Sequence, residues 1–405
     1  MKQFDAIVII TGSRWDQDYS SASISLAREL SKTQLVFFID NPFSWKDVIR
    51  GWNTPSIRRR VKALLFGKEI YRAIEPENKN WIAVTPLVNI PINWLPEGYL
   101  YQVFSKINNW IFYKTLRRLI REKNLKRFIL FNSYNPFYGY ELPPDVKPLV
   151  NIYQSRDNIR ESEYVKKHGP RLEQIAARNA EIRLATSTDL VDKLTAPQYP
   201  FWFFPNAADV DLFNKAMVRN ESEKQDLATL KRPIIGYMGN ICLRVDYDLL
   251  LKVAQKYAHA TLLMVGPRND KHQHTIDFTR LQNITFVGPK NIKELPDYLA
   301  FMDCTILPFK VNDLTRSIYP LKINEYLAGG KPVVSTSFSP DINGFSPLVY
   351  ISNSHEEFLN NIDKALTEDS QERIQERMAV AKKNSWVERG KEFLELIDNQ
   401  IKGNN

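Results

Sequence analysis

The sequence predicts an α/β protein of two successive doubly wound domains, each with a mostly parallel sheet. The chain has 405 residues, and one hydrophobic core rarely grows beyond about 250–300 residues. Its apolar runs at 6–10 and 35–40 are continuous, as in strands buried on both faces, and a segment of helical periodicity separates them. The same alternation begins again at 233–240. Two domains built from strand–helix–strand units are therefore expected.

The boundary between the two domains is expected near residue 205. Residues 205–210 (PNAADV) combine Pro and Asn with small side chains, which suits a linker or crossover. We therefore expect an N-terminal domain at 1–205, a C-terminal domain at 206–384 and a final amphipathic helix within 385–405.

In the first half, further strands are expected at 127–133, 148–157 and 182–188. No GxGxxG follows the first strand, so the dinucleotide-binding fingerprint is absent. Asp16 and Asp157 each follow a strand, and ligands of doubly wound sheets bind at the carboxyl ends of the strands. Either carboxylate could orient or deprotonate a hydroxyl group of a ligand as a catalytic group. A structural or capping role is the alternative for both.

Positive charge is concentrated in the first half of the chain. Residues 1–205 carry 30 Lys and Arg against 20 Asp and Glu, whereas residues 206–405 carry 25 against 26. Segments 56–74 and 93–124 mix cations with aromatic and aliphatic side chains, as amphipathic helices on an anionic membrane surface do. Ordinary domain helices with a solvated basic face are the alternative. The charge indicates an anionic partner, such as a lipid headgroup, a nucleic acid or a phosphorylated substrate.

Composition and hydropathy predict a cytoplasmic protein. The N-terminal apolar run is too short for a signal peptide, and no apolar run reaches the ~18 residues that a membrane span needs. Cys242 and Cys304 lie in apolar segments without metal-ligand spacing, so neither a disulfide nor a zinc site is expected. If the basic segments bind lipid, the protein is peripheral on the inner face of the plasma membrane.

The stretch Thr315–Thr336 (TRSIYPLKINEYLAGGKPVVST) is the most informative in the second half. Pro320 favours a first helical turn, whose free amides attract a phosphate. Lys322 and Glu325 are three residues apart, so they project from one face of that helix. There they can offer a cation to a phosphate and a carboxylate to a sugar diol. From local features, an ordinary helix–strand turn with surface charges is the alternative.

Five segments of the second half follow one another in a characteristic order: FPNAADVDLF (204–213), IIGYMGNICLRVDYDLLLKVA (234–254), LLMVGP (262–267), ITFVGPKNIKELPDYLAFMDCTILPF (284–309) and PLKINEYLAGGKPVV (320–334). This order resembles that of the large bacterial retaining family of nucleotide-sugar-dependent glycosyltransferases, glycosyl transferases group 1, which have the GT-B fold. The helix from Trp386 onward is similar to that family's terminal helix, which crosses back to the N-domain. The resemblance implies two Rossmann-like domains that face a central cleft. The first half fits in fold pattern only, as expected for a domain that binds a variable acceptor.

The resemblance implies donor-binding roles for residues of the stretch at 315–336. Glu325 would accept hydrogen bonds from the ribose hydroxyls of the donor. Lys322 would neutralise the diphosphate as charge moves onto the leaving group, and the backbone amides of Ile318 and its neighbours would share that load.

The resemblance also implies donor contacts from three loops. Arg244, in the loop after Gly239, and Arg268, after Gly266, are candidates to bind the diphosphate, with a solvated surface position as the alternative for each. The turn from Val287 to Lys290 would meet the nucleobase through its backbone. No divalent ion or cofactor is expected, because Lys and Arg are available to stabilise the leaving group.

The sequence departs from the family pattern at two places. Ser317 stands eight residues before Glu325, where the family's motif usually has a second glutamate that contacts the transferred sugar. In the family an arginine usually follows the loop glycine, but here Asn240 follows Gly239. The family's lysine six residues further on is replaced by Asp246. The identity of the sugar therefore stays open.

Taken together, these features predict a glycosyltransferase of hexosyltransferase type. It would move a sugar from a nucleoside-diphosphate sugar to a glycan, polysaccharide or lipid-linked acceptor without a metal ion. Retention of configuration is implied by the resemblance alone. A GT-B nucleotide-sugar epimerase and a non-catalytic nucleotide-sugar-binding scaffold are the alternatives. The first needs acid and base groups around the sugar, and Ser317 favours the second. Nucleic acid is not an expected partner, because no DNA- or RNA-binding motif is present.

Overall fold

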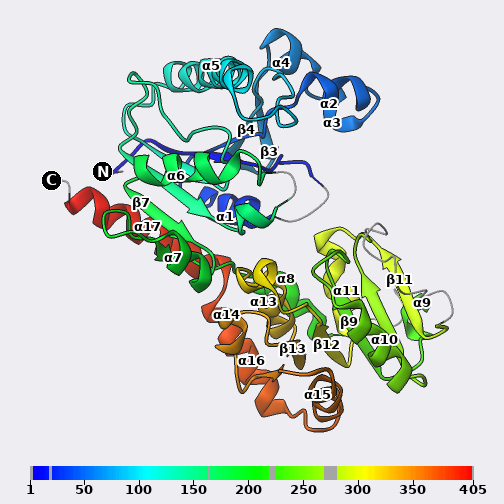
Figure 1. Ribbon diagram of the computed structural model, residues 1–405. Helices are drawn as coiled ribbons and strands as arrows, with labels where there is room; N and C mark the ends of the chain where they lie inside the picture. Colours follow the sequence, from blue (N-terminus) through cyan, green and yellow to red (C-terminus); the bar gives the residue numbers. More distant parts are fainter. Residues whose placement is uncertain (1–2, 18–20, 163–164, 219–224, 269–280, 404–405) are drawn as a thin grey trace. The chain divides into compact units, whose positions relative to one another are not determined.

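The computed structural model describes residues 3–17, 21–162, 165–218, 225–268 and 281–403, without the side chains of residues 225 and 226. The chain divides into two compact units, each with its own sheet (Figure 1). Unit 1 comprises Met1–Thr186, Leu190–Phe204 and Gly390–Asn405, and unit 2 comprises Ser187–Asp189 and Pro205–Arg389.

Unit 1 contains an eight-stranded sheet in the order β3-β4-β2-β1-β5-β6-β7-β8. Neighbouring strands are parallel except for β3 and β4, an antiparallel pair at one edge. From β1 the chain first adds β2, β3 and β4 on one side and then crosses to add β5 to β8 on the other side. A topological switch point therefore lies between β1 and β5. The strands are β1 (Ala6–Thr11), β2 (Val36–Ile39), β3 (Tyr71–Glu75), β4 (Asn78–Val84), β5 (Phe128–Ser133), β6 (Val150–Ser155), β7 (Ile182–Ala185) and β8 (Trp202–Phe203).

The expected central strands of unit 1 are confirmed, and their burial explains the sequence pattern. Every residue of β1, β2, β5 and β6 is buried. Strands covered on both faces have no solvent side on which polar residues would alternate. The helices of this unit are α1 (Ala22–Ser31), α2 (Trp45–Arg50), α3 (Pro55–Arg58), α4 (Val61–Phe66), α5 (Tyr99–Glu122) and α6 (Gly169–Asn179), with part of α7 (Thr188–Leu194).

The helix expected over 56–74 is wrong, whereas the one within 93–124 is confirmed as α5. The first segment contains two short helices, α3 and α4, followed by the edge strand β3. Gly67 ends α4 with a φ of 62°, a left-handed conformation that glycine adopts without strain. The residues after it pair with β4, a long-range interaction that overrides helical periodicity.

Unit 2 contains a six-stranded, fully parallel sheet in the order β11-β10-β9-β12-β13-β14. Its first strand, β9, is central, and the chain moves outward from it in both directions. This is the doubly wound Rossmann order, with the switch point between β9 and β12. The strands are β9 (Ile234–Met238), β10 (Thr261–Val265), β11 (Ile284–Gly288), β12 (Cys304–Leu307), β13 (Val333–Thr336) and β14 (Val349–Ser352).

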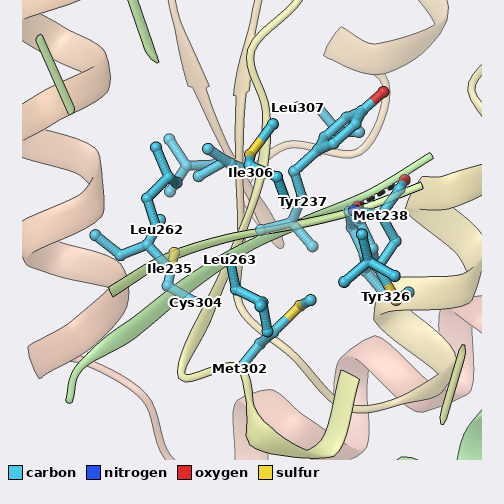
Figure 2. Packing of buried hydrophobic residues seen from close by; sticks show 14 of the residues in the cluster. Ile235, Tyr237, Met238, Leu262, Leu263, Met302, Cys304, Ile306, Leu307 and Tyr326 are labelled. Atoms are coloured by element: carbon cyan, nitrogen blue, oxygen red, sulfur yellow. Dashed lines mark hydrogen bonds between the residues drawn. The ribbon is translucent and has the colours of Figure 1, made fainter. Parts of the chain in front are cut away.

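The core of unit 2 joins this sheet to its helices. Figure 2 shows side chains of β9, β10 and β12 packed together with Met302 and with Tyr326 of α13. The last four residues of the stretch Thr315–Thr336 form β13. The helices are α8 (Val210–Phe213), α9 (Gln225–Ala228), α10 (Tyr247–Lys256), α11 (Leu295–Phe301), α12 (Asp313–Arg316), α13 (Leu321–Ala328), α14 (Pro340–Asn343), α15 (His355–Thr367) and α16 (Gln371–Lys383).

The final helix, α17 (Trp386–Gly403), returns to unit 1. Phe393 is fully buried, and its ring centroid lies 4.8 Å from that of Phe131 on β5 and 5.9 Å from that of Phe204. The expectation that the last helix crosses back to the N-terminal domain is therefore confirmed.

We predict that Phe393→Ala lowers the free energy of unfolding by about 3–5 kcal/mol, because it removes a buried aromatic ring and leaves a cavity. Urea unfolding followed by circular dichroism measures the change. Val387→Ala is the matched control, because Val387 lies on the same helix and is 39% exposed. Equal effects of the two substitutions would contradict the packing described for α17.

Candidate functional site

The position of α13 is fixed by the hydroxyl of Tyr326. This hydroxyl accepts a hydrogen bond from the amide of Met238 at 2.7 Å and lies 3.3 Å from the carbonyl oxygen of the same residue (Figure 2). Met238 is the last residue of β9, so the helix is tied to the sheet beside the switch point. Ligands of this fold bind outside the carboxyl ends of the strands at that point.

Lys322 lies directly over the turn that follows β9. A Cβ atom added to Gly239 would lie 1.8 Å from Cε of Lys322, so a larger residue there would displace the end of this side chain. Gly239 also has a φ of 139°, which other residues rarely adopt. The Nζ atom of Lys322 lies 5.9 Å from the ring centroid of Tyr237. The cation is thereby held at the end of the central strand.

The turns after β9, β10 and β11 lie edge to edge. The amide of Gly239 donates to Val265 O at 2.8 Å, and that of Gly266 donates to Gly288 O at 2.9 Å. A Cβ atom on Gly266 would lie 2.1 Å from Gly239 O, so the two turns are packed backbone to backbone. Val287 is the unpaired extra residue of a bulge where β11 meets β10. The expected loop residues Gly239, Gly266 and Val287 are thus brought together.

Glu325 is buried and 6% exposed, on the same face of α13 as Lys322. Burial raises the pKa of its carboxyl group to about 7, an effect that Lys322 opposes and Asp209 increases. Its carboxylate has no hydrogen bond to any residue in the described part of the chain. A buried carboxylate in this state is suited to a ligand that supplies donors.

The electrostatics of Lys322 mirror those of Glu325. Burial lowers the pKa of the Lys322 ammonium; Glu325 opposes this effect, and the nearby charge of Arg244 adds to it. An anion bound beside Lys322 would compensate both the desolvation and the repulsion from Arg244.

The free amides at the start of α13 are not those expected from the sequence. Ile318 N donates to Thr315 O at 3.0 Å, so the amide of Ile318 is already used. Pro320 is the N-cap and not the first helical residue, and it offers no side-chain cap. The amides of Leu321 and Lys322 have no acceptor among the described residues. These two amides therefore replace that of Ile318 as the anion-binding candidates.

The two candidate arginines differ in position. Arg244 is half-buried in the loop after β9, where its carbonyl accepts the amide of Lys310 from the loop after β12. It therefore lies at the switch point. Arg268 is exposed, and its guanidinium lies 4.7 Å from the ring centroid of Phe286 on β11.

Ser317, where the family motif usually has an acid, is fully buried and donates to a carboxylate from a distant part of the chain. Its hydroxyl lies 2.5 Å from Oδ2 of Asp189, whose Oδ1 accepts from Nε of Arg316 at 3.0 Å. Sequence reasoning missed Asp189, because nothing local links residues 128 positions apart.

Two Asp-x-Asp sequences, at 209–211 and 246–248, each place their first acid at a helix N-cap. Asp209 accepts the amide of Leu212 at 3.1 Å, and Asp246 accepts that of Leu249 at 3.0 Å. Within the described ranges, no three His, Cys, Asp or Glu residues are grouped as metal ligands would be.

Asp16 is a structural carboxylate and not a free base. Arg60 donates to both of its oxygens at 2.7 Å and also to Asp40 at 2.9 Å. Burial acts to raise the pKa of Asp16, but the hydrogen bonds and charge of Arg60 outweigh it and hold that pKa below its usual value. A carboxylate bound in this way is a weak proton acceptor, which favours the structural role for Asp16.

Asp157 keeps its place as a candidate. It is half-buried after β6, and no residue in the described ranges donates a hydrogen bond to its carboxylate. The neighbouring Arg156 donates to Ser23 at 2.7 Å.

A pocket of about 920 Å³ lies within unit 1 at the carboxyl edge of its sheet. Strand ends at 11–14 and 133–138, on both sides of the switch point, form part of its lining, together with 89–94, α2 and α5. The lining of the pocket includes six asparagines and four cationic side chains but only one carboxylate, that of Asp47. These residues are Asn41, Asn89, Asn93, Asn108, Asn109, Asn135, Arg14, Lys46, Arg50 and Arg156.

Comparison with solved structures establishes the GT-B fold. Sucrose-phosphate synthase from Thermosynechococcus elongatus matches with a TM-score of 0.69 and 14% identity, covering 98% of this chain and 99% of that one. The α,α-trehalose 6-phosphate synthase of Burkholderia multivorans matches with a TM-score of 0.69 and 11% identity over 99% of both chains. Anabaena HepE in complex with UDP matches with a TM-score of 0.65 and 14% identity, over 97% and 100%.

Comparison of sequences connects the site in unit 2 to a family. A family model described as "Glycosyl transferases group 1" matches residues 232–368, a range that contains Gly239, Lys322 and Glu325. The "Putative teichuronic acid biosynthesis glycosyltransferase TuaH" of Bacillus subtilis (strain 168) is 28% identical over 201 residues, 48% of this chain and 50% of that protein. The match thus spans about half the length of this curated relative. The resemblance to the group 1 glycosyltransferases is confirmed.

We predict that Tyr326→Phe lowers the free energy of unfolding by about 1–3 kcal/mol, because it leaves the buried amide of Met238 without its partner. Thermal unfolding measures the loss. Tyr350→Phe is the matched control, since the hydroxyl of Tyr350 is half-buried and bonds to charged side chains at the surface. A loss no greater than that of the control would contradict the anchoring role of Tyr326.

Proposed function

We propose that this protein is a hexosyltransferase that moves a sugar from a nucleoside-diphosphate sugar bound in unit 2. The single observation that supports this most is the arrangement at α13. There, Lys322 lies over Gly239 with two free amides beside it, and Glu325 is buried one turn further on. This arrangement offers positive charge to a diphosphate and an acceptor to a ribose. The family model covers the whole of it.

In this proposal, each group acts where charge changes during transfer. Lys322, Arg244 and the amides of Leu321 and Lys322 stabilise the diphosphate leaving group as the glycosidic bond to the donor breaks. The carboxylate of Glu325 accepts hydrogen bonds from the two ribose hydroxyls. Arg268 and the backbone at Val287 lie along the neighbouring turns, where the rest of the nucleotide would be held.

We propose that the reaction needs no divalent ion. Lys322 and Arg244 supply the positive charge at the leaving group that a metal ion supplies elsewhere. Retention of configuration is proposed from the resemblance to the retaining family. Proton NMR of the product's anomeric signal tests retention, and transfer in excess EDTA tests the role of a metal.

We propose a glycan, polysaccharide or lipid-linked molecule as the acceptor, bound in the pocket of unit 1. Amide side chains and cations suit a polyhydroxylated, anionic ligand. The name of the relative from Bacillus subtilis, which refers to teichuronic acid biosynthesis, supports an acidic polysaccharide. Asp157 is the carboxylate available to orient an acceptor hydroxyl.

Within the described residues, no helix is long and apolar enough to cross a membrane. We propose a cytoplasmic location, peripheral to the membrane.

Two other functions remain distinguishable by experiment. A nucleotide-sugar epimerase would invert a carbon of the donor sugar in the absence of an acceptor. The mass of the nucleotide sugar would not change, but its NMR spectrum would. A non-catalytic scaffold would bind the donor without turnover, and the buried Ser317 in place of an acid is the feature that favours it. A panel of donors with mass detection of product separates both from a transferase.

We predict that Lys322→Ala and Glu325→Ala each weaken donor binding about ten- to hundred-fold, because each removes a charged hydrogen-bond partner worth about 1.5–3 kcal/mol. Isothermal titration calorimetry measures the affinity, and release of free nucleotide measures turnover. Lys293→Ala, at an exposed position of the same unit, is the control and should leave both unchanged. Wild-type binding and transfer by both site variants would show that the donor binds elsewhere.

Donor affinity is expected to rise as the pH increases from 6 to 8. The pKa of Glu325 is raised to about 7, so protonation at low pH removes the ionised acceptor that the ribose needs. A nucleotide sugar is a diphosphate diester that does not itself titrate in this range. Calorimetric titration across pH measures the trend, and Glu325→Gln should abolish it. A pH dependence that persists in this variant would exclude Glu325 as its source.

A further inference from the structure

Helix α5 presents an apolar face to solvent. Its buried face contains the polar residues Ser105, Asn108 and Asn109, which also line the pocket of unit 1. The opposite face exposes Leu100 (61%) and Trp110 (59%), together with Ile107, at helical spacing. The helix also packs apolar side chains of its buried face into the core of unit 1, so the exposed apolar residues are additional to those that cover the core.

A second apolar face lies on α2, across the same pocket. Its Val48 points into the core, whereas Trp45, Ile49 and the following Trp52 are 49%, 73% and 49% exposed. Lys46, Asp47 and Arg50 of this helix line the pocket. The pocket is therefore bounded by two helices whose outer faces are apolar.

Trp94 is a further exposed apolar residue at this pocket. It lines the pocket and is also 72% exposed. Of the fifteen large hydrophobic residues that are exposed in the described part of the chain, nine lie between residues 45 and 110. Single exposed apolar residues are ordinary, but a concentration of this kind around one pocket marks a binding surface.

The charge of the surrounding segment identifies the kind of partner. Residues 45–68, which form α2, α3 and α4, contain six exposed basic residues and one acid, and α5 adds Lys106 and Lys114 on its exposed side. The seventh basic residue, Arg60, is buried between Asp16 and Asp40 and is not part of this surface. A second copy of the chain would bring like charges together. A lipid bilayer with acidic headgroups suits this surface, because tryptophan rings insert at headgroup level and the surrounding cations pair with anionic lipids.

We propose that the outer faces of α2 and α5, together with Trp94, form a docking surface for an anionic lipid bilayer. Indole rings and aliphatic side chains enter the headgroup region, and the surrounding cations pair with lipid phosphates. The pocket then opens at headgroup level. If the proposed transferase function holds, its acceptor is an anionic lipid-linked glycan that stays in the bilayer while its polar part enters the pocket.

Vesicle binding by the full chain tests the docking surface without reference to enzymatic activity. Co-sedimentation is measured with vesicles of equal phosphatidylcholine and phosphatidylglycerol and with vesicles of phosphatidylcholine alone, in low and high salt. Wild-type protein should bind the anionic vesicles, at least tenfold more weakly in high salt. Equal binding to both vesicle types, or to neither, would overturn the proposal.

Trp110→Glu and Trp202→Glu form a matched pair, because both side chains are 59% exposed and only Trp110 lies on the docking surface. We predict at least a tenfold loss of vesicle binding for Trp110→Glu and no loss for Trp202→Glu. Equal binding by the two variants would contradict the proposal. Quenching of wild-type tryptophan fluorescence by brominated lipids gives a second readout that needs no variant, and its absence would also overturn the proposal.

Sedimentation velocity without vesicles separates the lipid surface from a protein partner. A concentration-dependent dimer of wild-type protein that Trp110→Glu dissociates would show that a second copy covers these faces, and would overturn the proposal. A monomer in both cases supports it. Thermal unfolding of each variant confirms that the comparison is made between folded proteins.

Discussion

The tie between the hydroxyl of Tyr326 and the backbone of Met238 sets the geometry on which the proposed donor site depends. It holds the helix α13 against the end of the central strand β9. The side chain of Lys322 thereby lies over Gly239, where an added Cβ atom would displace its end. The same tie places Glu325 in the interior, although nothing in the described part of the chain donates a hydrogen bond to it. One buried hydroxyl thus orders a cation, two free amides and a desolvated carboxylate.

These groups are unfavourably placed until a ligand arrives. Burial lowers the pKa of Lys322 and raises that of Glu325, so each loses part of its preference for the charged state. A diphosphate beside Lys322 and a ribose beside Glu325 would compensate both. Strongly perturbed ionisable groups at the switch point of a doubly wound sheet are a physical reason to expect function there.

Local patterns predicted the strands and the position of α13, but not the partners that distant residues supply. Asp16 and Asp157 follow strands in the same way, and only the fold reveals that Arg60, 44 positions away from Asp16, neutralises the first. Ser317 likewise meets Asp189 across 128 positions. The failed helix at 56–74 has the same origin, because pairing of β3 with β4 outweighed the local periodicity. Sequence signals of a few residues fix local structure, whereas the state of a side chain depends on long-range packing.

Hydrogen–deuterium exchange of the full chain, with and without UDP-, GDP-, dTDP- and CMP-sugars, shows directly whether the donor binds in unit 2. A nucleoside-diphosphate sugar should slow exchange in the peptides at 239–244 and 320–326, where the free amides and the loop after β9 would contact it. Protection confined to the pocket of unit 1, protection by the CMP-sugar alone, or no protection by any of the four would contradict the assignment of unit 2 as the donor site.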